Sequence, residues 1–457
     1  MKSGGVPVRD WRVWMLALLA LLPAVVTYLI LWRTTTAIPY MDDYDAILGF
    51  ANVYHRLPSL SARLLYINDA THVQYKLILL HSIVAFNVDV LHRIDFGLIE
   101  WLGNVSLLLI GWCLWRMFPH ADIRQRLLFF LPVPLLVFVL RDNEAMGWAM
   151  DCLQLVAVVG YALLSLYLFC GKKLGWFVGG CIAFVLAAWS SANGLLVLPV
   201  ALLVLWQAHA WRRIAALLLL TAVVMISYLH GFHPDLPTPN GHAASPLIIP
   251  AFYVALLGNV FSRWWLACPF GFVLLCFVVP VVWKAFVRDR RVDAVSASML
   301  FLLLNAGLMT MGRYRFTLGG ALPSRYSIYS QVLVALTYIA YIRPILARAP
   351  TGWSWLTLPR VYLASTTFAL LLFVHYERVG ARFSRERQAA SIAHMGAWEN
   401  YSHKSSLVAL DEPEIQRNFA PWIPHASLVL EESMRQGIYV PPVLPRPAAP
   451  PQFFLRY

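Results

Sequence analysis

Apolar runs of about twenty residues recur along this chain, and a helix needs roughly that length to cross the hydrocarbon core of a membrane. Of the 457 residues, 60% are hydrophobic and only 13% are charged, which is too little charge to cover the surface of a soluble protein of this length. We therefore expect an all-α polytopic membrane protein with about 11 transmembrane helices. The predicted spans are 12–32, 94–115, 124–140, 146–169, 174–191, 193–209, 213–230, 264–286, 294–311, 326–342 and 359–375.

The net charge of +13 comes from the short connections between these apolar runs. Lys and Arg residues gather in alternate connections, which the positive-inside rule places in the cytoplasm. This distribution favours membrane orientation over nucleic-acid binding, and we expect no nucleic-acid partner. The basic connections hold Arg116, Arg124, Arg126, Lys172, Lys173, Arg212, Arg213, Lys284, Arg288, Arg290, Arg291, Arg343 and Arg348.

With the N-terminus in the cytoplasm, the first long loop and the C-terminal tail face outward. We expect a transmembrane module over 1–375, whose first outer loop is 33–93, and a small outer C-terminal region over 376–457. The proline-broken segment 231–262 is expected to be re-entrant or interfacial. Apolar residues recur at helical spacing within the first loop, which predicts helices that lie on the membrane surface. The residues of this amphipathic pattern include Leu77, Ile78, Leu80, His81, Val84 and Ala85.

Three carboxylates, Asp42, Asp43 and Asp45, closely follow the first apolar run. A carboxylate beside hydrocarbon is costly unless it is solvated, paired or used in chemistry. These residues could cap a helix that begins near Tyr44, since Asp is a frequent N-cap. A role in chemistry is the alternative, because the predicted topology brings further polar residues to the same side. These are Asn68, Asp69, Thr71, His72, Gln74 and Lys76, then Arg141, Asp142, Asn143, Glu144 and Asp151, and finally Arg313, Tyr314, Arg315, Ser324, Arg325 and Tyr326.

Carboxylates beside several arginines suit a reaction in which a carboxylate takes a proton and a guanidinium binds a departing phosphate. The six cysteines show no CxxC or Cys/His spacing, so neither a zinc site nor a disulfide framework is expected. The pattern therefore indicates group transfer from a phosphate-bearing substrate at the outer membrane surface.

An aspartate pair just after the first span is typical of the GT-C superfamily of membrane glycosyltransferases, and this chain resembles that superfamily in layout. The shared features are a long first outer loop, many spans and a soluble outer tail. The segments Pro39–Asp45, Thr71–Gln74 and Ser324–Tyr326 look like a bacterial branch that decorates surface polysaccharides or pilins from polyprenyl-phosphate sugars. Related chains often carry Glu-His-Arg where this one has Thr71-His72-Val73, so that element is only partly kept.

The resemblance implies an inverting hexosyl- or pentosyltransferase, such as a glucosyl- or arabinosyltransferase, at the periplasmic face of a bacterial inner membrane. Its partners would be the bilayer, a polyprenyl-phosphate-linked sugar and a glycan or protein acceptor. Asp42 or Asp43 would be the base, and Arg325, helped by Arg313 or Arg315, would bind the lipid phosphate. No cofactor is required, although a divalent metal would be compatible. Substrate contacts are expected from Asp45, His72, Gln74, Lys76, Arg141, Glu144 and Tyr326.

A transporter or flippase of lipid-linked sugars is the main alternative, because it also needs basic residues that face a lipid phosphate. A transporter should carry polar residues near the middle of the membrane, whereas the runs 174–189 and 213–227 are almost purely apolar. An O-antigen ligase or polymerase is a second alternative, but its chemistry would lie in a late outer loop. Arg325 could also be an interfacial anchor, and Arg141 and Glu144 could form a local ion pair.

Overall fold

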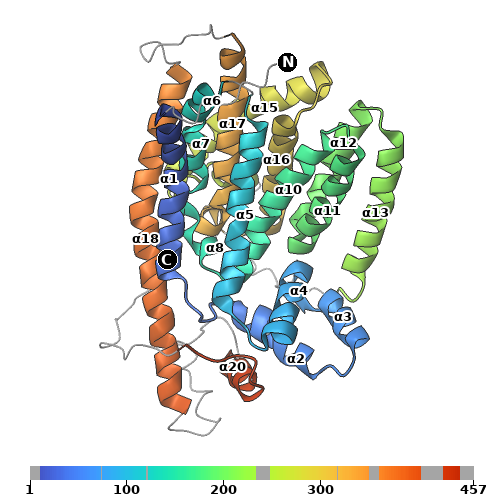
Figure 1. The fold of residues 1–457 in the computed structure, drawn as a ribbon, viewed down its shortest axis with the longest axis vertical. Helices are drawn as coiled ribbons and strands as arrows, with labels where there is room; N and C mark the ends of the chain where they lie inside the picture. Colours follow the sequence, from blue (N-terminus) through green and yellow to red (C-terminus); the bar gives the residue numbers. More distant parts are fainter. Residues whose placement is uncertain are drawn as a thin grey trace.

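The computed structural model describes residues 11–73, 75–119, 122–232, 248–315, 317–348, 360–402 and 426–442. These residues form a bundle of long helices with a group of short helices at one end (Figure 1). A two-stranded antiparallel hairpin, β1 (Thr71–His72) and β2 (Tyr75–Lys76), lies in that end group. The described part of the chain is therefore helical apart from this hairpin and the connections.

Eight helices among the described residues are long and apolar enough to cross a membrane. They coincide with eight of the predicted spans, so the class of an all-α, multi-pass membrane protein agrees with the structure. The eight are α1 (Trp11–Thr34), α5 (Phe96–Met117), the broken span Ile123–Met146, the span Ala149–Phe169 that ends in α10 (Ala157–Phe169), α13 (Trp211–Leu229), α15 (Trp264–Trp283) with η6 (Lys284–Arg288), α16 (Ala294–Arg313), and η8 (Ser324–Tyr326) with α17 (Ser327–Arg348).

The other three predicted spans fall on helices of a different kind. Two of them coincide with α11 (Leu174–Ser190) and with η5 (Ala192–Leu196) plus α12 (Val197–Gln207), which are apolar but shorter. The third falls in α18 (Arg360–Ser402), a helix of 43 residues that continues well beyond the predicted span. A total of about 11 spans therefore stays a prediction. The boundary expected between residues 375 and 376 also lies inside α18.

Prolines break the span predicted at 124–140. The helix α6 (Ile123–Phe130) ends before α7 (Pro132–Val137), which begins on Pro132. Proline lacks an N–H group, so it is tolerated in the first turn of a helix but not in its interior. After α7 the chain continues as η3 (Leu140–Asp142) and α8 (Asn143–Met146). Because of this break, the polar residues 141–144 do not continue a regular helix. They lie near the end of the bundle that carries the short helices (Figure 1).

The segment expected to be re-entrant or interfacial is described from residue 248 onward. Its helix α14 (Ile248–Leu257) packs closely against α15. A Cβ atom at Gly258 would lie 1.9 Å from the carbonyl oxygen of Ala267, so this close approach requires glycine. Residues 233–247, where the proline-broken part was expected, lie outside the described residues.

The first outer loop folds into a compact unit around an apolar core that it shares with residues of α5 and of the fourth span. The helical periodicity predicted for residues 77–85 is present in α4 (Ile78–Phe86), but the residues named for the predicted face are at most 5% exposed. They pack into this core, so the prediction that this face lies on the membrane surface is wrong. Three leucines on α3 are exposed instead: Leu60, Leu64 and Leu65. The unit comprises η1 (Tyr44–Gly49), α2 (Phe50–Arg56), α3 (Leu60–Asp69), the hairpin, α4 and η2 (Asn87–Leu91).

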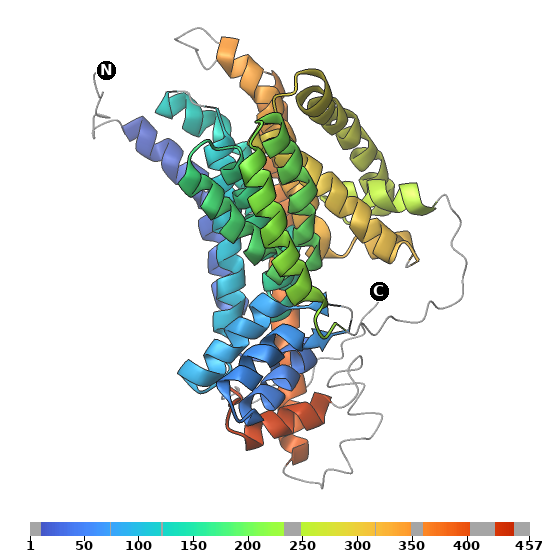
Figure 2. The same ribbon diagram turned by 90° about the vertical axis from the view of Figure 1, so that its right-hand side faces the viewer.

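The C-terminal helix α20 (Ala426–Arg435) packs against η1 and α2 at the same end of the bundle (Figure 2). The Asn52 side chain donates a hydrogen bond to the carbonyl oxygen of Val429 at 2.9 Å. The amide of Ile94 donates to the carbonyl oxygen of Ile438 at 2.7 Å. The first outer loop and the described C-terminal segment therefore form one body.

Candidate active site

Four polar stretches that are distant in the sequence meet where the first outer loop contacts the bundle. The amide of Met150 donates to Asp43 Oδ1 at 3.0 Å, which ties the aspartate loop to the start of the fourth span. Arg313 Nη2, at the end of α16, donates to the Tyr75 hydroxyl in β2 at 2.7 Å. The expected gathering of these stretches at one end of the bundle is therefore present in the structure.

Asp43 is buried and ties the loop to the bundle. Its side chain is 1% exposed, and its Oδ2 atom accepts a second backbone hydrogen bond, from Tyr40 at 3.1 Å. Burial raises the pKa of Asp43 well above its usual value, and the two amide donors only partly offset this effect. Although Asp43 directly precedes η1, its side chain makes no capping hydrogen bond. The helix-cap interpretation therefore does not apply to Asp43.

Asp42 and Asp45 are open to solvent, with side chains that are 39% and 58% exposed. They face the two ring nitrogens of His72, whose side chain is only 6% exposed. His72 Nδ1 lies 2.8 Å from Asp45 Oδ2, which is a hydrogen bond. His72 Nε2 lies 3.7 Å from Asp42 Oδ2, a close charge contact that is too long for a hydrogen bond.

These contacts set the charge of the three groups. Burial lowers the pKa of His72, but interaction with Asp42 and Asp45 outweighs burial and raises it to about 9. The hydrogen bond from His72 lowers the pKa of Asp45 in turn. Burial, with the nearby charge of His72, lowers the pKa of His81 to about 3 and keeps that residue neutral. At neutral pH His72 is therefore charged, and its two ring nitrogens face the side chains of Asp42 and Asp45.

Arg325 is neutralised within the protein. Its Nη1 atom donates to Glu144 Oε1 at 2.8 Å, and its Nε atom lies 3.9 Å from Asp151 Oδ2. The hydroxyl of Ser324 donates to Glu144 Oε2 at 3.3 Å, so the Glu144 carboxylate is held through both oxygens. Glu144 thus pairs with Arg325, and the local ion pair expected between Arg141 and Glu144 is absent from the described contacts.

Arg313 forms no ion pair with any carboxylate among the residues that the structure describes. Besides the hydrogen bond to Tyr75, its guanidinium lies over the Tyr326 ring, 5.1 Å from the ring centroid. A partly buried guanidinium that lacks an acidic partner attracts an anion. Arg315, two residues later, is exposed and lies over the Tyr314 ring. Of the two neighbouring arginines, Arg313 is the one directed into the site.

Aromatic rings separate the cations of this region. Arg387 of α18 lies over Tyr40, and the edge of Tyr40 meets Trp148 with 5.6 Å between ring centroids. Arg325 lies over both Trp148 and Tyr326, at 5.4 and 5.3 Å from the ring centroids. Cation–π contacts fix the orientation of a guanidinium without cancelling its charge. The predicted substrate contact Tyr326 thus lies between Arg313 and Arg325 and positions both.

Lys76 does not contact the aspartates and arginines described above. Its side chain is completely buried, and Nζ donates to the carbonyl oxygens of Ser227, at 3.1 Å, and of His230. These bonds connect the hairpin to the end of α13, so the structure gives Lys76 a structural role. Gln74, the other residue expected from this stretch, lies outside the described residues.

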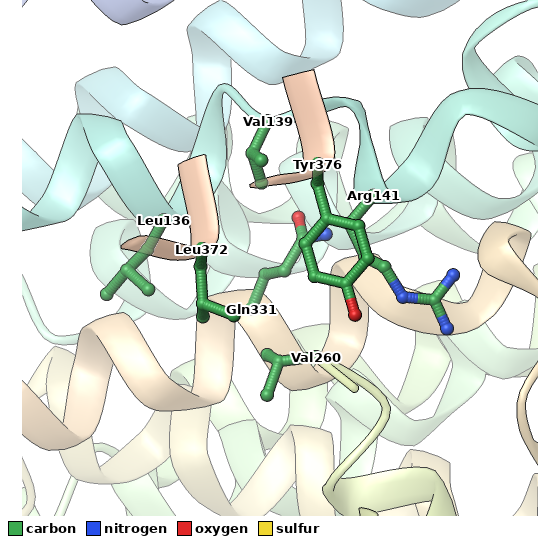
Figure 3. A pocket seen from close by; sticks show the side chains of 7 residues that line it. All are labelled: Leu136, Val139, Arg141, Val260, Gln331, Leu372 and Tyr376. Carbon is green, nitrogen blue, oxygen red and sulfur yellow. The ribbon is translucent and has the colours of Figure 1, made fainter. Parts of the chain in front are cut away.

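Arg141 points into the bundle. It is 5% exposed, and Nη2 donates to the carbonyl oxygen of Leu322 at 3.0 Å and to Asn259 Oδ1 at 2.5 Å. Its guanidinium lies over the Tyr376 ring in a small pocket between α7, α17 and α18 (Figure 3). Arg141 therefore braces the bundle and does not join the Asp42 cluster. The residues lining the pocket are Leu136, Val139, Arg141, Val260, Gln331, Leu372 and Tyr376.

Two residues enter the site without a role assigned from the sequence. Asp151 is 4% exposed and interacts electrostatically with Asp42, Glu144 and Arg325. Tyr75 holds Arg313 by its hydroxyl. Tyr75 pairs with His72 across the hairpin. Strands of two residues leave little periodicity to detect, so the sequence alone did not indicate this pairing.

Within the described ranges, no group of three or more His, Cys, Asp or Glu side chains is arranged to hold a metal ion. The His72 imidazole, the nitrogen ligand nearest the aspartates, is engaged by Asp45.

No protein-family model, curated protein or solved structure matches this chain. Its function therefore has to be argued from the site.

Proposed function

We propose that this protein is a membrane glycosyltransferase of the GT-C type, which moves a sugar from polyprenyl phosphate to an extracytoplasmic acceptor. The supporting observation is an exposed carboxylate, Asp42, in the same cluster as Arg313, a guanidinium that forms no ion pair with the described carboxylates. Asp42 and Arg313 both interact electrostatically with Asp151, so they belong to one cluster. Transfer from a lipid phosphate needs such a base and such a phosphate-binding cation together.

Transfer proceeds by a single displacement. The acceptor hydroxyl gives its proton to Asp42 as its oxygen bonds to the anomeric carbon. The bond between that carbon and the phosphate oxygen breaks, and its electron pair leaves with the polyprenyl phosphate. The Arg313 guanidinium binds the phosphate charge as it develops. The configuration at the anomeric carbon inverts, and Asp42 later releases its proton to water.

We assign the base to Asp42 because a general base must reach the proton that it takes. Both oxygens of Asp43 accept backbone hydrogen bonds, and its side chain is buried. We assign the phosphate chiefly to Arg313, because Glu144 already neutralises Arg325. Arg325 then holds Glu144 in place and lies over the Tyr326 ring, which Arg313 also contacts.

The proposal includes about 11 spans in a bacterial inner membrane, with the first outer loop and the region 376–457 in the periplasm. The connections rich in Lys and Arg lie at the end of the bundle opposite the first outer loop (Figure 1). Such connections remain in the cytoplasm during insertion. The site then faces outer-leaflet lipid.

Labelling of single cysteines tests this orientation in a background whose six native cysteines are replaced. Leu64→Cys, at an exposed position of α3, is expected to react with a maleimide that cannot cross the inner membrane. Lys173→Cys, in a basic connection, is expected to react only after that membrane is opened. The reverse pattern would put Asp42 in the cytoplasm and contradict the proposal.

Transport or flipping of a lipid-linked sugar is the second candidate, and polar contacts inside the bundle favour it. Asn193 donates to Asn305 Oδ1 at 3.0 Å, and Gln331 donates to the Ser327 hydroxyl at 3.0 Å. Polar side chains buried in membrane helices mark either substrate paths or structural ties. The two functions differ in whether the bond between sugar and phosphate breaks.

A donor panel tests the enzymatic proposal. The purified protein is incubated with polyprenyl-phosphate hexoses and pentoses labelled in the sugar, together with cell-surface glycan and pilin acceptors. One donor is expected to lose its label to an acceptor, with equimolar release of polyprenyl phosphate. Failure with every donor and acceptor would count against the enzyme.

A further inference from the structure

His72 stands in an unusual setting, since both of its ring nitrogens face carboxylates while its side chain is almost completely buried. The imidazole comes from β1, and the two carboxylates precede and begin η1. The Nδ1 atom is hydrogen-bonded to Asp45 at 2.8 Å, and the Nε2 atom lies 3.7 Å from Asp42. With a 6% exposed side chain, His72 offers almost no surface to a sugar or an acceptor. This argues against the substrate contact expected for it from the sequence.

The titratable groups around His72 and Asp42 come from several elements. The loop before η1 contributes Asp42, and η1 contributes Asp45. From α4, His81 is neutral and adds no charge, because burial lowers its pKa to about 3. Asp151 interacts with Asp42 from the start of the fourth span, and it interacts in turn with Arg313 and Arg325. His72 is thus the cation in direct contact with Asp42.

We propose that His72, held in place by Asp45, is a positioning residue whose charge holds the Asp42 carboxylate next to the acceptor hydroxyl. This inference rests on the proposed function, because it fixes the position of the proposed base. The imidazolium attracts the Asp42 side chain, whereas Asp151 is a negative neighbour. The raised pKa of His72, about 9, keeps this cation present through the neutral range. Asp45 fixes the ring through Nδ1, so the Nε2 edge faces Asp42.

The test compares pH profiles of kcat for the purified wild type and His72→Asn. The asparagine amide keeps a donor near the position of Nδ1 but carries no charge. The wild type is expected to lose activity as pH rises through about 9, where His72 loses its proton, and His72→Asn is expected to lack this limb. At pH 7, kcat is expected to fall about tenfold, while the donor KM stays within about twofold.

Asp45 supplies the second half of the test. Asp45→Asn is expected to weaken the hold on the ring and to move the alkaline limb to lower pH, because His72 then loses its proton more readily. Asp45→Glu, which restores a carboxylate acceptor, is expected to recover most of the wild-type profile. His55→Asn, at an exposed position of α2, is the matched control and is expected to leave the profile unchanged.

The outcomes separate this inference from the proposed function. An active wild type with an inactive Asp42→Asn, combined with an unshifted His72→Asn profile, would overturn the role of His72 alone. If His72→Asn lost donor affinity while its pH profile stayed that of the wild type, His72 would be a substrate-binding residue. That result would also overturn the positioning role. An inactive wild type would remove both proposals. If His72→Asn fails to fold, the pH profiles of Asp45→Asn and Asp45→Glu decide between the outcomes. Asp45 is exposed, so its substitution is expected to leave the fold intact.

Discussion

Asp42→Asn is expected to lower kcat by about 100- to 10,000-fold, the range that a general base contributes. The asparagine amide is isosteric with the carboxylate but cannot take the acceptor proton. The side chain is 39% exposed and its nearest cation is His72, so the substitution removes no buried hydrogen bond. Folding and the donor KM are therefore expected to stay close to wild type. The measurement is transfer of labelled sugar by purified protein at saturating donor.

Asp43→Asn is the control for this prediction, because it places the same change one residue away. Both Asp43 oxygens accept backbone N–H groups, whereas an amide can accept only through its oxygen. We expect a lower thermal midpoint in detergent for Asp43→Asn, with the active fraction retaining a measurable kcat. If Asp43→Asn is folded but inactive while Asp42→Asn transfers sugar normally, the base has been assigned to the wrong residue.

Arg313→Ala is expected to raise the donor KM by about 10- to 100-fold, because charge-assisted hydrogen bonds to a phosphate are each worth about 1.5–3 kcal/mol. A guanidinium at the edge of the hydrocarbon is poorly screened, so its loss is felt strongly. Arg313→Lys is expected to recover only part of the affinity, since an ammonium cannot bind phosphate in a bidentate manner. Binding of labelled donor to purified protein measures the effect.

Arg315→Ala is the matched control, because Arg315 is exposed only two residues away and contacts the Tyr314 ring. Its donor affinity is expected to stay within about twofold of wild type. Arg325→Ala leaves the Glu144 carboxylate without its partner, and we expect it to impair stability as well as binding. If Arg325→Ala weakened donor binding in a stable protein while Arg313→Ala did not, the phosphate would belong to Arg325.

The membrane class was predictable from the sequence because a long apolar run has few alternatives to a spanning helix. Eight runs became helices of sufficient length, including the proline-broken one. The apolar periodicity of 77–85 misled for a physical reason. A helix that is apolar on one face has the same pattern whether that face meets lipid or a protein core, and here it meets the core of the first outer loop.

The sequence predicted which stretches form the site, but it did not predict the role of each residue within it. Asp42 and Asp43 are neighbours with the same side chain, and the backbone amides of Tyr40 and of the distant Met150 make Asp43 the structural one. In the same way, Glu144 neutralises Arg325, from 181 residues away, and not Arg313. Such long-range contacts leave no local pattern. The roles of Lys76 and Arg141 were missed for the same reason, since their partners lie on other helices.

The most direct test of the account follows one donor in proteoliposomes, with the sugar and the polyprenyl chain labelled separately. The account predicts that the wild-type protein splits the two labels, releasing polyprenyl phosphate as the sugar joins an acceptor, and that Asp42→Asn does not. Movement of both labels together across the bilayer, with no splitting in either protein, would contradict it and identify a transporter.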